Sequence, residues 1–509
     1  MNPSTARPHV VIVGGGIAGL AAAFFLRDEP VRVTVLEGSP RLGGKLSVSE
    51  VAGVPVDEGA EALLVTRPEG TGLIAELGLA GDRVAPGTTS SAIWTLGALH
   101  PLPRRQFMGV PSDLAELNRS GVVSGAGAAR ASQDLELPPT AREGDVPVAD
   151  FVGARFGAEV VDRLVDPLLG GVYAGRSAEL SFDATMPALA AASRRHRSLA
   201  EAAGSLLPSP PPSAPVAEQD RAPGGTRSGG SVFTSLAGGL GQLPAFLAKA
   251  SGAEIRTAAV TRALSPAPNA PDSPAGQGPG PGWRLTLGSA ASEELIHADA
   301  VILAVPARPA ARLLAGVPGA SAAVAAFGEI SYASMAIVTL AYPRSAFPGV
   351  SSAGGLAALG WSGYLVPAVD GRTVKAVTFS TVKWPHLADP APGAAPLEIV
   401  RCSVGRIGEE AVLQRADEDL AALAAAELAA ATGVHGAPVA HRVTRWGGAL
   451  PQYTVGHLDR VARIRAAVAT QPGLAVCGAV YEGVGIPACV ATARAAADRV
   501  TEFLRVGRQ

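Results

Sequence analysis

Apolar and polar positions follow a similar order at the two ends of the chain. Residues 9–13 form a short apolar run, residues 17–26 have helical spacing after a glycine cluster, and residues 31–36 form a second apolar run. The C-terminal part has an apolar run at 474–477 and helical spacing over 486–504. These lengths predict a parallel sheet with covering helices, built from both ends of the sequence.

The middle of the chain predicts a different mixture of elements. Residues 148–204 have the spacing of amphipathic helices, and residues 408–432 predict one long alanine-rich helix. A continuous apolar run at 300–306 predicts a buried strand, and runs at 336–342 and 374–381 predict an antiparallel or mixed sheet. A chain of 509 residues is too long for one hydrophobic core, so we expect more than one lobe.

Two segments have a composition that opposes folding. Proline, serine and glycine dominate residues 205–231 and again residues 266–281. Such segments bury too little apolar surface to offset the entropy lost on ordering. We therefore expect flexible insertions at both places, and the sequence does not reveal what the insertion at 205–231 does.

The overall charge excludes some functions. The formal net charge is -2 and the sequence pI is near 6.5, so we expect no nucleic-acid partner. The apolar runs are too short to span a bilayer, which predicts no transmembrane segment and leaves peripheral membrane contact open. The first nine residues also lack the layout of a secretory signal.

The cysteines are sparse and scattered. Cys402, Cys477 and Cys489 form neither a CxxC pair nor a cluster with metal-ligand spacing. This set fits a reducing cytosol, so we expect a cytoplasmic protein with no metal site. It also argues against the redox dithiol of the disulfide reductases.

The N-terminal glycine cluster has a nucleotide-binding pattern. Gly14, Gly16 and Gly19 fill a GxGxxG motif between the first strand and the first helix. The first glycine permits a tight turn, the second lets a pyrophosphate approach the backbone, and the third lets the helix pack close to the strand. The helix N-terminus offers N–H groups to the phosphates, and Glu37 is placed at the end of the second strand for the ribose hydroxyls.

Two further segments favour FAD over NAD. The run Arg41-Leu42-Gly43-Gly44-Lys45 resembles the extension with which amine-oxidase-like flavoproteins wrap the flavin pyrophosphate. In that superfamily, the helix after the C-terminal turn, here 478–485, points its N-terminus at the flavin ring, where the dipole stabilises negative charge. Many relatives carry Asp where this chain has Ala479. No second complete GxGxxG unit follows a mid-chain strand, so we expect no NADPH domain, and molecular oxygen is the simplest electron acceptor.

The predicted fold class is α/β. We expect a discontinuous, FAD-binding Rossmann-type domain from residues 1–90, 232–315 and 455–509. Between its parts we expect an inserted substrate domain, with a helical lobe at 100–204 and a substrate-binding mixed or antiparallel sheet at 316–454.

Two mid-chain segments narrow the resemblance to one enzyme family. The run Gly171-Val172-Tyr173-Ala174-Gly175 is similar to a signature of the protoporphyrinogen and coproporphyrinogen oxidases. Trp446 and the segment 450–457, which reads LPQYTVGH, resemble another signature of that family. Ala479 followed by Tyr481 also matches this branch better than the amine oxidases with Asp. The similarity runs from residue 9 to the C-terminal helix, apart from the two proline-rich segments.

The resemblance implies a six-electron oxidation of a porphyrinogen to the aromatic porphyrin, with oxygen as acceptor and hydrogen peroxide as by-product. Within the family it favours a coproporphyrinogen III oxidase that makes coproporphyrin III for haem b, and protoporphyrinogen IX oxidase is the alternative. An amine oxidase or a carotenoid desaturase is a more distant alternative, because the FAD motifs are shared. A flavin- or haem-pathway binding protein without turnover is the alternative outside enzymes. A haem-pathway partner such as ferrochelatase is a further expectation.

The resemblance also assigns residues. The cofactor is expected to be non-covalent FAD, held by the residues Gly14, Gly15, Gly16, Ile17, Ala18, Gly19, Glu37, Arg41, Gly43, Gly44, Lys45, Gly59, Ala60, Val260, Trp446, Ile486, Pro487 and Ala488. The substrate is expected to contact Arg67, Gly171, Tyr173 and Gly175. No catalytic side chain is expected, because aromatisation drives the reaction.

Two further residues lie near these motifs. Glu61 stands where some relatives have Arg, so the groups that bind the propionates remain unassigned. His457 is expected at the start of a helix, where capping or packing is more common than catalysis.

Overall fold

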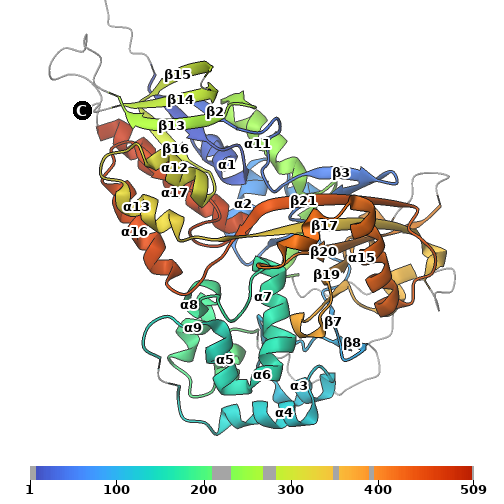
Figure 1. Ribbon diagram of the computed structural model, residues 1–509. Helices are drawn as coiled ribbons and strands as arrows, with labels where there is room; N and C mark the ends of the chain where they lie inside the picture. The colour runs from blue at the N-terminus through green and yellow to red at the C-terminus, as the bar shows by residue number, and fades with distance from the viewer. Residues whose placement is uncertain are drawn as a thin grey trace, which may run out of the picture.

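The computed structural model describes residues 7–140, 142–208, 231–267, 282–289, 291–347, 355–388 and 395–506. Most of the two segments expected as flexible insertions, residues 209–230 and 268–281, lies outside the described residues. Figure 1 shows a parallel sheet with its covering helices at one end of the molecule, a long mixed sheet beside it, and a helical lobe below.

The parallel sheet is the one that the apolar runs predict. Its order is β12-β2-β1-β16-β22, and every neighbouring pair is parallel. Both faces of the sheet are covered, which explains why its strands read as continuous apolar runs rather than alternating ones. The five strands are β1 (His9–Val13), β2 (Arg32–Leu36), β12 (Glu254–Arg256), β16 (Ala300–Leu303) and β22 (Leu474–Val476).

Different layers cover its two faces. Val10 and Ile12 face one layer, which consists of α1 (Ile17–Phe25), α2 (Pro68–Glu76), α11 (Leu243–Ser251) and α17 (Ile486–Val506). Val11 and Val13 face the other, which consists of β13 (Thr261–Pro266), β14 (Trp283–Ser289), β15 (Ser292–Ala298), α12 (Ala307–Leu314), α13 (Ser321–Gly328) and α16 (His457–Ala469). The expected boundary at 316 differs from this arrangement, because Phe327 of α13 is buried in this second layer.

The second large sheet has the order β21-β17-β20-β19-β18-β7-β8 and is mixed, since only β18 and β7 pair in parallel. Its strands are β7 (Ala92–Thr95), β8 (Ala98–Pro101), β17 (Tyr332–Pro343), β18 (Gly363–Leu365), β19 (Val374–Phe379), β20 (Leu397–Val404) and β21 (Ala440–Pro451). The strand predicted to reach 381 ends at Phe379, where α14 (Ser380–Lys383) begins. The helix predicted from 408 is α15 (Asp417–Thr432), which covers one face and begins with three acidic residues that suit a helix N-terminus.

The helical lobe occupies the region where amphipathic spacing predicts it, and also includes residues before 148. Its helices are α3 (Leu114–Ser120), α4 (Gly125–Ser132), α5 (Val148–Phe156), α6 (Ala158–Val160), α7 (Asp166–Tyr173), α8 (Phe182–Thr185), α9 (Pro187–Ser193) and α10 (Leu199–Ser205). A π-helical turn, η3 (Val161–Val165), joins α6 to α7. None of the helices that the structure describes is long and apolar enough to cross a bilayer.

Short elements connect these layers. The small strands are β3 (Val48–Val51), β4 (Val54–Asp57), β5 (Leu63–Leu64), β6 (Arg83–Val84), β9 (Gln106–Phe107), β10 (Val110–Pro111) and β11 (Phe233–Leu236). The 3-10 turns are Ala80–Asp82, Gln133–Leu135, Leu240–Gln242, Arg344–Ala346, Gly355–Leu359, Ala368–Asp370, Pro385–Leu387 and Glu410–Gln414.

A buried ion pair holds the helical lobe together. Arg155 is 2% exposed and Asp134 is fully buried, and the guanidinium Nε donates to the Asp134 carboxylate. The other guanidinium N–H groups donate to the carbonyls of Asp134, Pro138 and Arg197. The same carboxylate accepts from the Ser198 hydroxyl at 2.6 Å, so it also holds the start of α10.

We predict that Arg155→Met lowers the free energy of unfolding by about 3–5 kcal/mol, because the Asp134 charge would stay buried without its partner. The measurement is urea unfolding followed by circular dichroism. Arg119→Met, on the exposed side of α3, is the matched control and should change stability by less than about 0.5 kcal/mol. Equal effects of the two substitutions would contradict the prediction.

Candidate functional site

The three glycines of the motif between β1 and α1 have different surroundings, and each is needed for a different purpose. Gly14 has φ +112°, and a Cβ there would overlap the Ala304 carbonyl oxygen. A Cβ on Gly19 would overlap the Gly14 carbonyl oxygen, so helix and strand touch through their backbones. A Cβ on Gly16 would meet nothing within 4 Å. The first and third glycines therefore serve the fold, while the second borders open space of the kind that a pyrophosphate fills.

Glu37 lies where a ribose-binding acid is expected. Its Oε2 accepts a hydrogen bond from the Gly15 N–H at 2.7 Å, and its Oε1 accepts from the Ser39 N–H at 2.8 Å. These bonds fix the carboxylate at the end of β2, beside the glycine turn.

The Arg41–Lys45 extension lies over the same turn. The Gly43 N–H donates to the Gly15 carbonyl at 2.8 Å, and a Cβ on Gly44 would come within 3.4 Å of the Gly16 Cα. The Arg41 guanidinium donates to the Gly44 carbonyl at 2.7 Å and so holds its own loop closed. Burial lowers the pKa of Lys45. The two glycine loops thus form one backbone cradle.

Gly59, Ala60 and Trp446 lie next to the extension loop and form a surface that we call the flavin wall. A Cβ on Gly59 would overlap the Lys45 carbonyl oxygen and would lie 3.6 Å from the Trp446 ring. The Trp446 indole N–H donates to the Glu58 carbonyl at 2.8 Å, and the Arg41 guanidinium lies 5.4 Å from its ring centre. The segment that contains Ala60 is therefore held between the extension loop and β21.

The C-terminal turn closes the cradle. A Cβ on Gly478 would lie 3.9 Å from the Ala18 Cβ, which places the turn against the start of α1. Ile486 and Ala488 are buried at the beginning of α17, and Pro487 packs against Gly70 of α2. The N-terminal and C-terminal motifs therefore meet, as their resemblance predicts.

Val260 lies at the rim of the site. It is half exposed, its carbonyl accepts from the Gly288 N–H at 3.1 Å, and its side chain is 3.6 Å from a Cβ built on Gly38. This position is beside the end of β2, since the N–H of the preceding Ala259 donates to the Glu37 carbonyl at 2.8 Å. The expected contact of Val260 with FAD stays a prediction.

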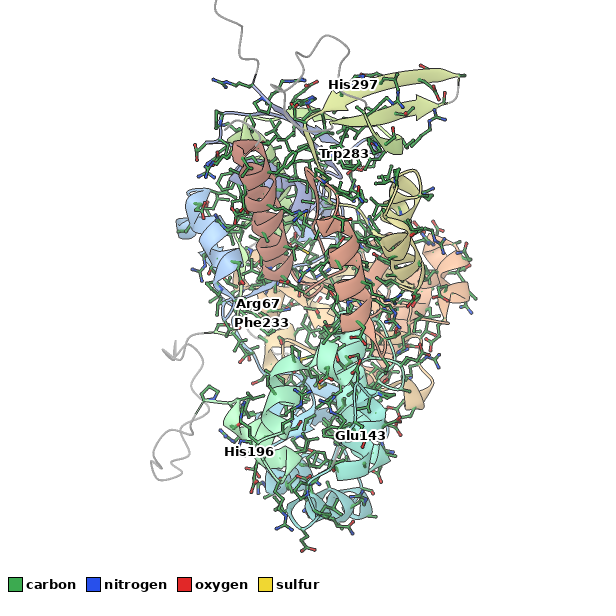
Figure 2. All side chains as sticks on the ribbon, turned by 90° about the vertical axis from the view of Figure 1, so that its left-hand side faces the viewer. Arg67, Glu143, His196, Phe233, Trp283 and His297 are labelled. Atoms are coloured by element: carbon green, nitrogen blue, oxygen red, sulfur yellow. The ribbon has the colours of Figure 1, made fainter. Side chains whose placement is uncertain are left out.

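The four predicted substrate residues lie in two places. Arg67 immediately precedes α2 (Figure 2). Its guanidinium is 3.7 Å from a Cβ built on Gly483, so it borders the C-terminal turn. Gly171 is exposed on α7, and a Cβ on it would lie 3.6 Å from the Leu365 side chain. Tyr173 is buried at the end of the same helix. A Cβ on Gly175 would overlap the Gln452 side chain, and its expected contact with the substrate stays a prediction.

Sequence reasoning missed the ion cluster behind the Gly59 segment. Glu61 forms ion pairs with Arg401 of β20 and with Lys383 of α14, and Arg401 also donates to the Gly59 carbonyl at 2.7 Å. Burial alone would raise the pKa of Glu61, but Lys383 and Arg401 outweigh it and lower the pKa to about 2. Glu61 thus shares its single negative charge between two cations, Lys383 and Arg401.

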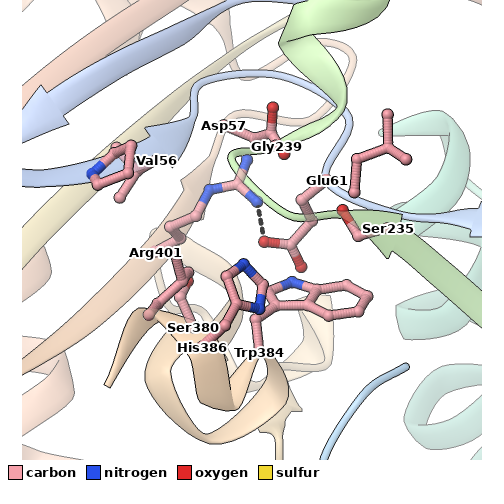
Figure 3. Close-up of a pocket in the computed structure, with 12 residues that line it drawn as sticks. Val56, Asp57, Glu61, Ser235, Gly239, Ser380, Trp384, His386 and Arg401 are labelled. Atoms are coloured by element: carbon pink, nitrogen blue, oxygen red, sulfur yellow. Dashed lines mark hydrogen bonds and ion pairs between the residues drawn. The ribbon is translucent and has the colours of Figure 1, made fainter. Parts of the chain in front are cut away.

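The same cluster borders a pocket that Glu61, Arg401 and Trp384 line (Figure 3). Asp57 also lines it, and burial raises the pKa of this carboxyl to about 6 against the hydrogen bonds from the Gly241 and Leu240 N–H groups. Since Asp57 and Glu61 flank the Gly59 segment, the pocket lies next to the predicted flavin wall.

The LPQYTVGH segment lies between the helical lobe and the C-terminal turn. Gln452 donates to the Tyr173 carbonyl at 2.8 Å, and the Tyr453 hydroxyl donates to the Ala479 carbonyl at 2.6 Å. His457 begins α16, is fully buried and stacks on the Tyr453 ring. Burial lowers the pKa of His457 to about 4, so its ring is neutral near pH 7, and the stacking is consistent with the expected capping or packing.

The parallel sheet, the glycine cradle and the closing C-terminal turn together define a flavoprotein oxidoreductase. The chain belongs to the flavin-containing amine oxidoreductase family, whose sequence pattern matches residues 17–501.

Two bacterial relatives are named coproporphyrinogen III oxidase. The one from Mycobacterium tuberculosis is 38% identical over 97% of each chain, and the one from Bacillus subtilis is 30% identical over 98% of this chain and 99% of its own. A relative from Macaca fascicularis, named protoporphyrinogen oxidase, is 30% identical over 96% of this chain and 98% of its own. A crystal structure from Exiguobacterium sp. 255-15, titled as a candidate protoporphyrinogen oxidase, is similar with a TM-score of 0.78 and 27% identity, over 98% of this chain and 99% of that one.

We predict that Gly16→Ala weakens FAD binding at least roughly tenfold without loss of stability, because the new methyl group meets no protein atom and enters the cradle. The measurements are FAD titration by flavin fluorescence quenching and thermal unfolding of the apoprotein. Gly72→Ala, where the methyl group is also unopposed but lies on the exposed side of α2, is the control and should bind FAD normally. Equal affinity of the two variants would place the pyrophosphate elsewhere.

The Glu61 cluster predicts a pH-dependent stability difference. The folded-state pKa near 2 lies below the unfolded value of 4.5, so the contribution is fully present above pH 4.5 and fades as the pH falls toward 2. We expect Glu61→Gln to cost about 3 kcal/mol at pH 7 and about 2 kcal/mol less at pH 3. Urea unfolding of both proteins at the two pH values measures this, and a pH-independent difference would rule out the ion pair as its source.

Proposed function

We propose that this chain is a coproporphyrinogen III oxidase that contains non-covalent FAD, uses oxygen and makes coproporphyrin III for haem b. Relatives of that name, which are 38% and 30% identical over nearly their full length, support the assignment of the substrate. The main structural support is that the segments 171–175 and 450–457 are in contact. Gln452 donates to the Tyr173 carbonyl at the end of α7, and the Tyr453 hydroxyl donates to the Ala479 carbonyl in the C-terminal turn. A substrate between the lobe and the sheet would therefore lie close to the flavin wall.

The residues of the cradle fit FAD. Gly14–Gly19 with Gly43 and Gly44 would hold the pyrophosphate, and Glu37 would bind the ribose hydroxyls. The bound flavin would supply the hydride acceptor for each two-electron oxidation. Gly59, Ala60, Trp446 and residues 486–488 would wall its ring and exclude water.

The cysteines support a non-covalent cofactor. All three are buried, and burial raises the pKa of Cys489 to about 11 and that of Cys402 to about 12. Burial raises the pKa of Cys477 as well. None of these thiols is therefore ready to form a thioether as a thiolate near pH 7.

The overall reaction converts one porphyrinogen and three molecules of oxygen into one porphyrin and three of hydrogen peroxide. Because aromatisation drives it, the protein mainly positions the macrocycle. Arg67, about two-fifths exposed beside Gly483, is proposed to bind a propionate at the mouth. Gly171 is proposed to let the flat macrocycle approach α7. A cytoplasmic location and a haem-pathway partner such as ferrochelatase complete the proposal.

Protoporphyrinogen IX is the second candidate substrate, because the relative from Macaca fascicularis is named for it. The two substrates differ in carrying four propionates or two, with vinyl groups in place of the others. Discrimination therefore depends on the number of carboxylates that the mouth of the pocket accepts.

We predict a faster initial gain of porphyrin fluorescence with coproporphyrinogen III than with protoporphyrinogen IX, both in air and against an enzyme-free control. Oxygen uptake should accompany it in a ratio of three molecules per porphyrin. A preference for protoporphyrinogen IX would select the second candidate, and rapid flavin reduction by amines alone would overturn both.

A further inference from the structure

The phenol of Tyr453 bridges two points of the C-terminal turn. Its hydroxyl donates to the Ala479 carbonyl at 2.6 Å and accepts from the Gly483 N–H at 2.9 Å. The Tyr453 side chain is 1% exposed, and its two backbone partners are partly buried. Burial raises the pKa of the phenol, which keeps the hydroxyl protonated and able to donate.

The turn depends on such support from outside. Gly478 has φ +126° and Gly483 has φ +135°, which are conformations that glycine adopts readily and other residues rarely adopt. Without the hydroxyl, a carbonyl and an N–H on the turn would both lose a buried partner. α17 begins at Ile486, directly after the turn, so the position of its N-terminus depends on the turn.

The ring that carries the hydroxyl is itself held on two sides. His457 stacks on it with centroids 3.8 Å apart and an interplanar angle of 14°. Tyr173 lies on another side at 5.4 Å, and Gln452 anchors the Tyr173 carbonyl. Packing of the ring against Tyr173 of α7 and His457 of α16 therefore holds the hydroxyl in place.

We propose that Tyr453 is a positioning residue, whose hydroxyl fixes the turn 478–485 and with it the N-terminus of α17 against the flavin ring. The proposal rests on the flavin site proposed above. The positive end of the helix dipole favours negative charge close to it, an effect that fades beyond the first turn. A displaced N-terminus should therefore favour reduced flavin less. Tyr453 touches neither substrate nor cofactor in this role and acts through the backbone of the turn.

The test is Tyr453→Phe, which keeps the stacked ring and removes only the hydroxyl. In the variant loaded with FAD, we expect a more negative flavin reduction potential and an altered flavin absorption spectrum. We also expect a dissociation constant for FAD raised roughly tenfold, as for the loss of one or two buried hydrogen bonds. The matched control is Tyr342→Phe, since Tyr342 is equally buried but packs under α15 against Phe347.

An unchanged potential and spectrum in Tyr453→Phe would overturn the proposal, even if thermal stability fell, because that result describes a purely structural residue. Equal shifts in Tyr342→Phe would overturn it too. These readouts need no porphyrinogen. Failure of the wild-type protein to oxidise either porphyrinogen would therefore count against the proposed function while leaving the test of Tyr453 intact.

Discussion

Backbone segments in the nucleotide site approach one another more closely than a Cβ atom would allow. Gly19 touches the Gly14 carbonyl, Gly14 touches the Ala304 carbonyl, and Gly59 touches the Lys45 carbonyl. These contacts join the first helix to β1, β1 to β16, and the extension loop to the wall beside Trp446. Because no flexible side chain lies in between, the spacing of the cradle is set by van der Waals contact of the backbone, which leaves little freedom for adjustment.

Ionic contacts extend this rigidity to the second sheet. Arg401 of β20 binds both the Glu61 carboxylate and the Gly59 carbonyl, and so joins the mixed sheet to the Gly59 segment in addition to the Trp446 indole of β21. Lys383 adds a second cation to the same carboxylate. Gln452, which directly follows β21, bonds to the helical lobe, and Tyr453 bonds to the C-terminal turn. Three regions of the molecule therefore converge on a few backbone atoms.

Local features of the site could be predicted from the sequence. Gly14, Gly16, Gly19 and Glu37 lie close together along the chain, and the spacing of a strand, a turn and a helix places them almost without reference to the rest of the fold. The α/β class and the mixed sheet also followed from the apolar runs and are confirmed.

The remaining features depend on register between distant segments. Glu61 and Arg401 are 340 positions apart, and their contact requires the pairing of β20 that no local pattern encodes. The addition of β7 and β8 to the mixed sheet has the same origin, as does the position of α13. The closeness of Gly175 to the Gln452 side chain, 277 positions away along the chain, has the same origin.

The packing of α1 against α17 shapes how the protein emerges from the ribosome. The apolar face of α1 is complete only when α17 packs against it, so a nascent chain leaves part of that face uncovered until α17 has been synthesised. β16 likewise lacks one of its neighbouring strands until β22 has been synthesised. Such distant pairings make folding slow and favour protection by chaperones. The proposed flavin pocket is closed by residues 486–488, so a nascent chain cannot complete this site before those residues have been synthesised and folded.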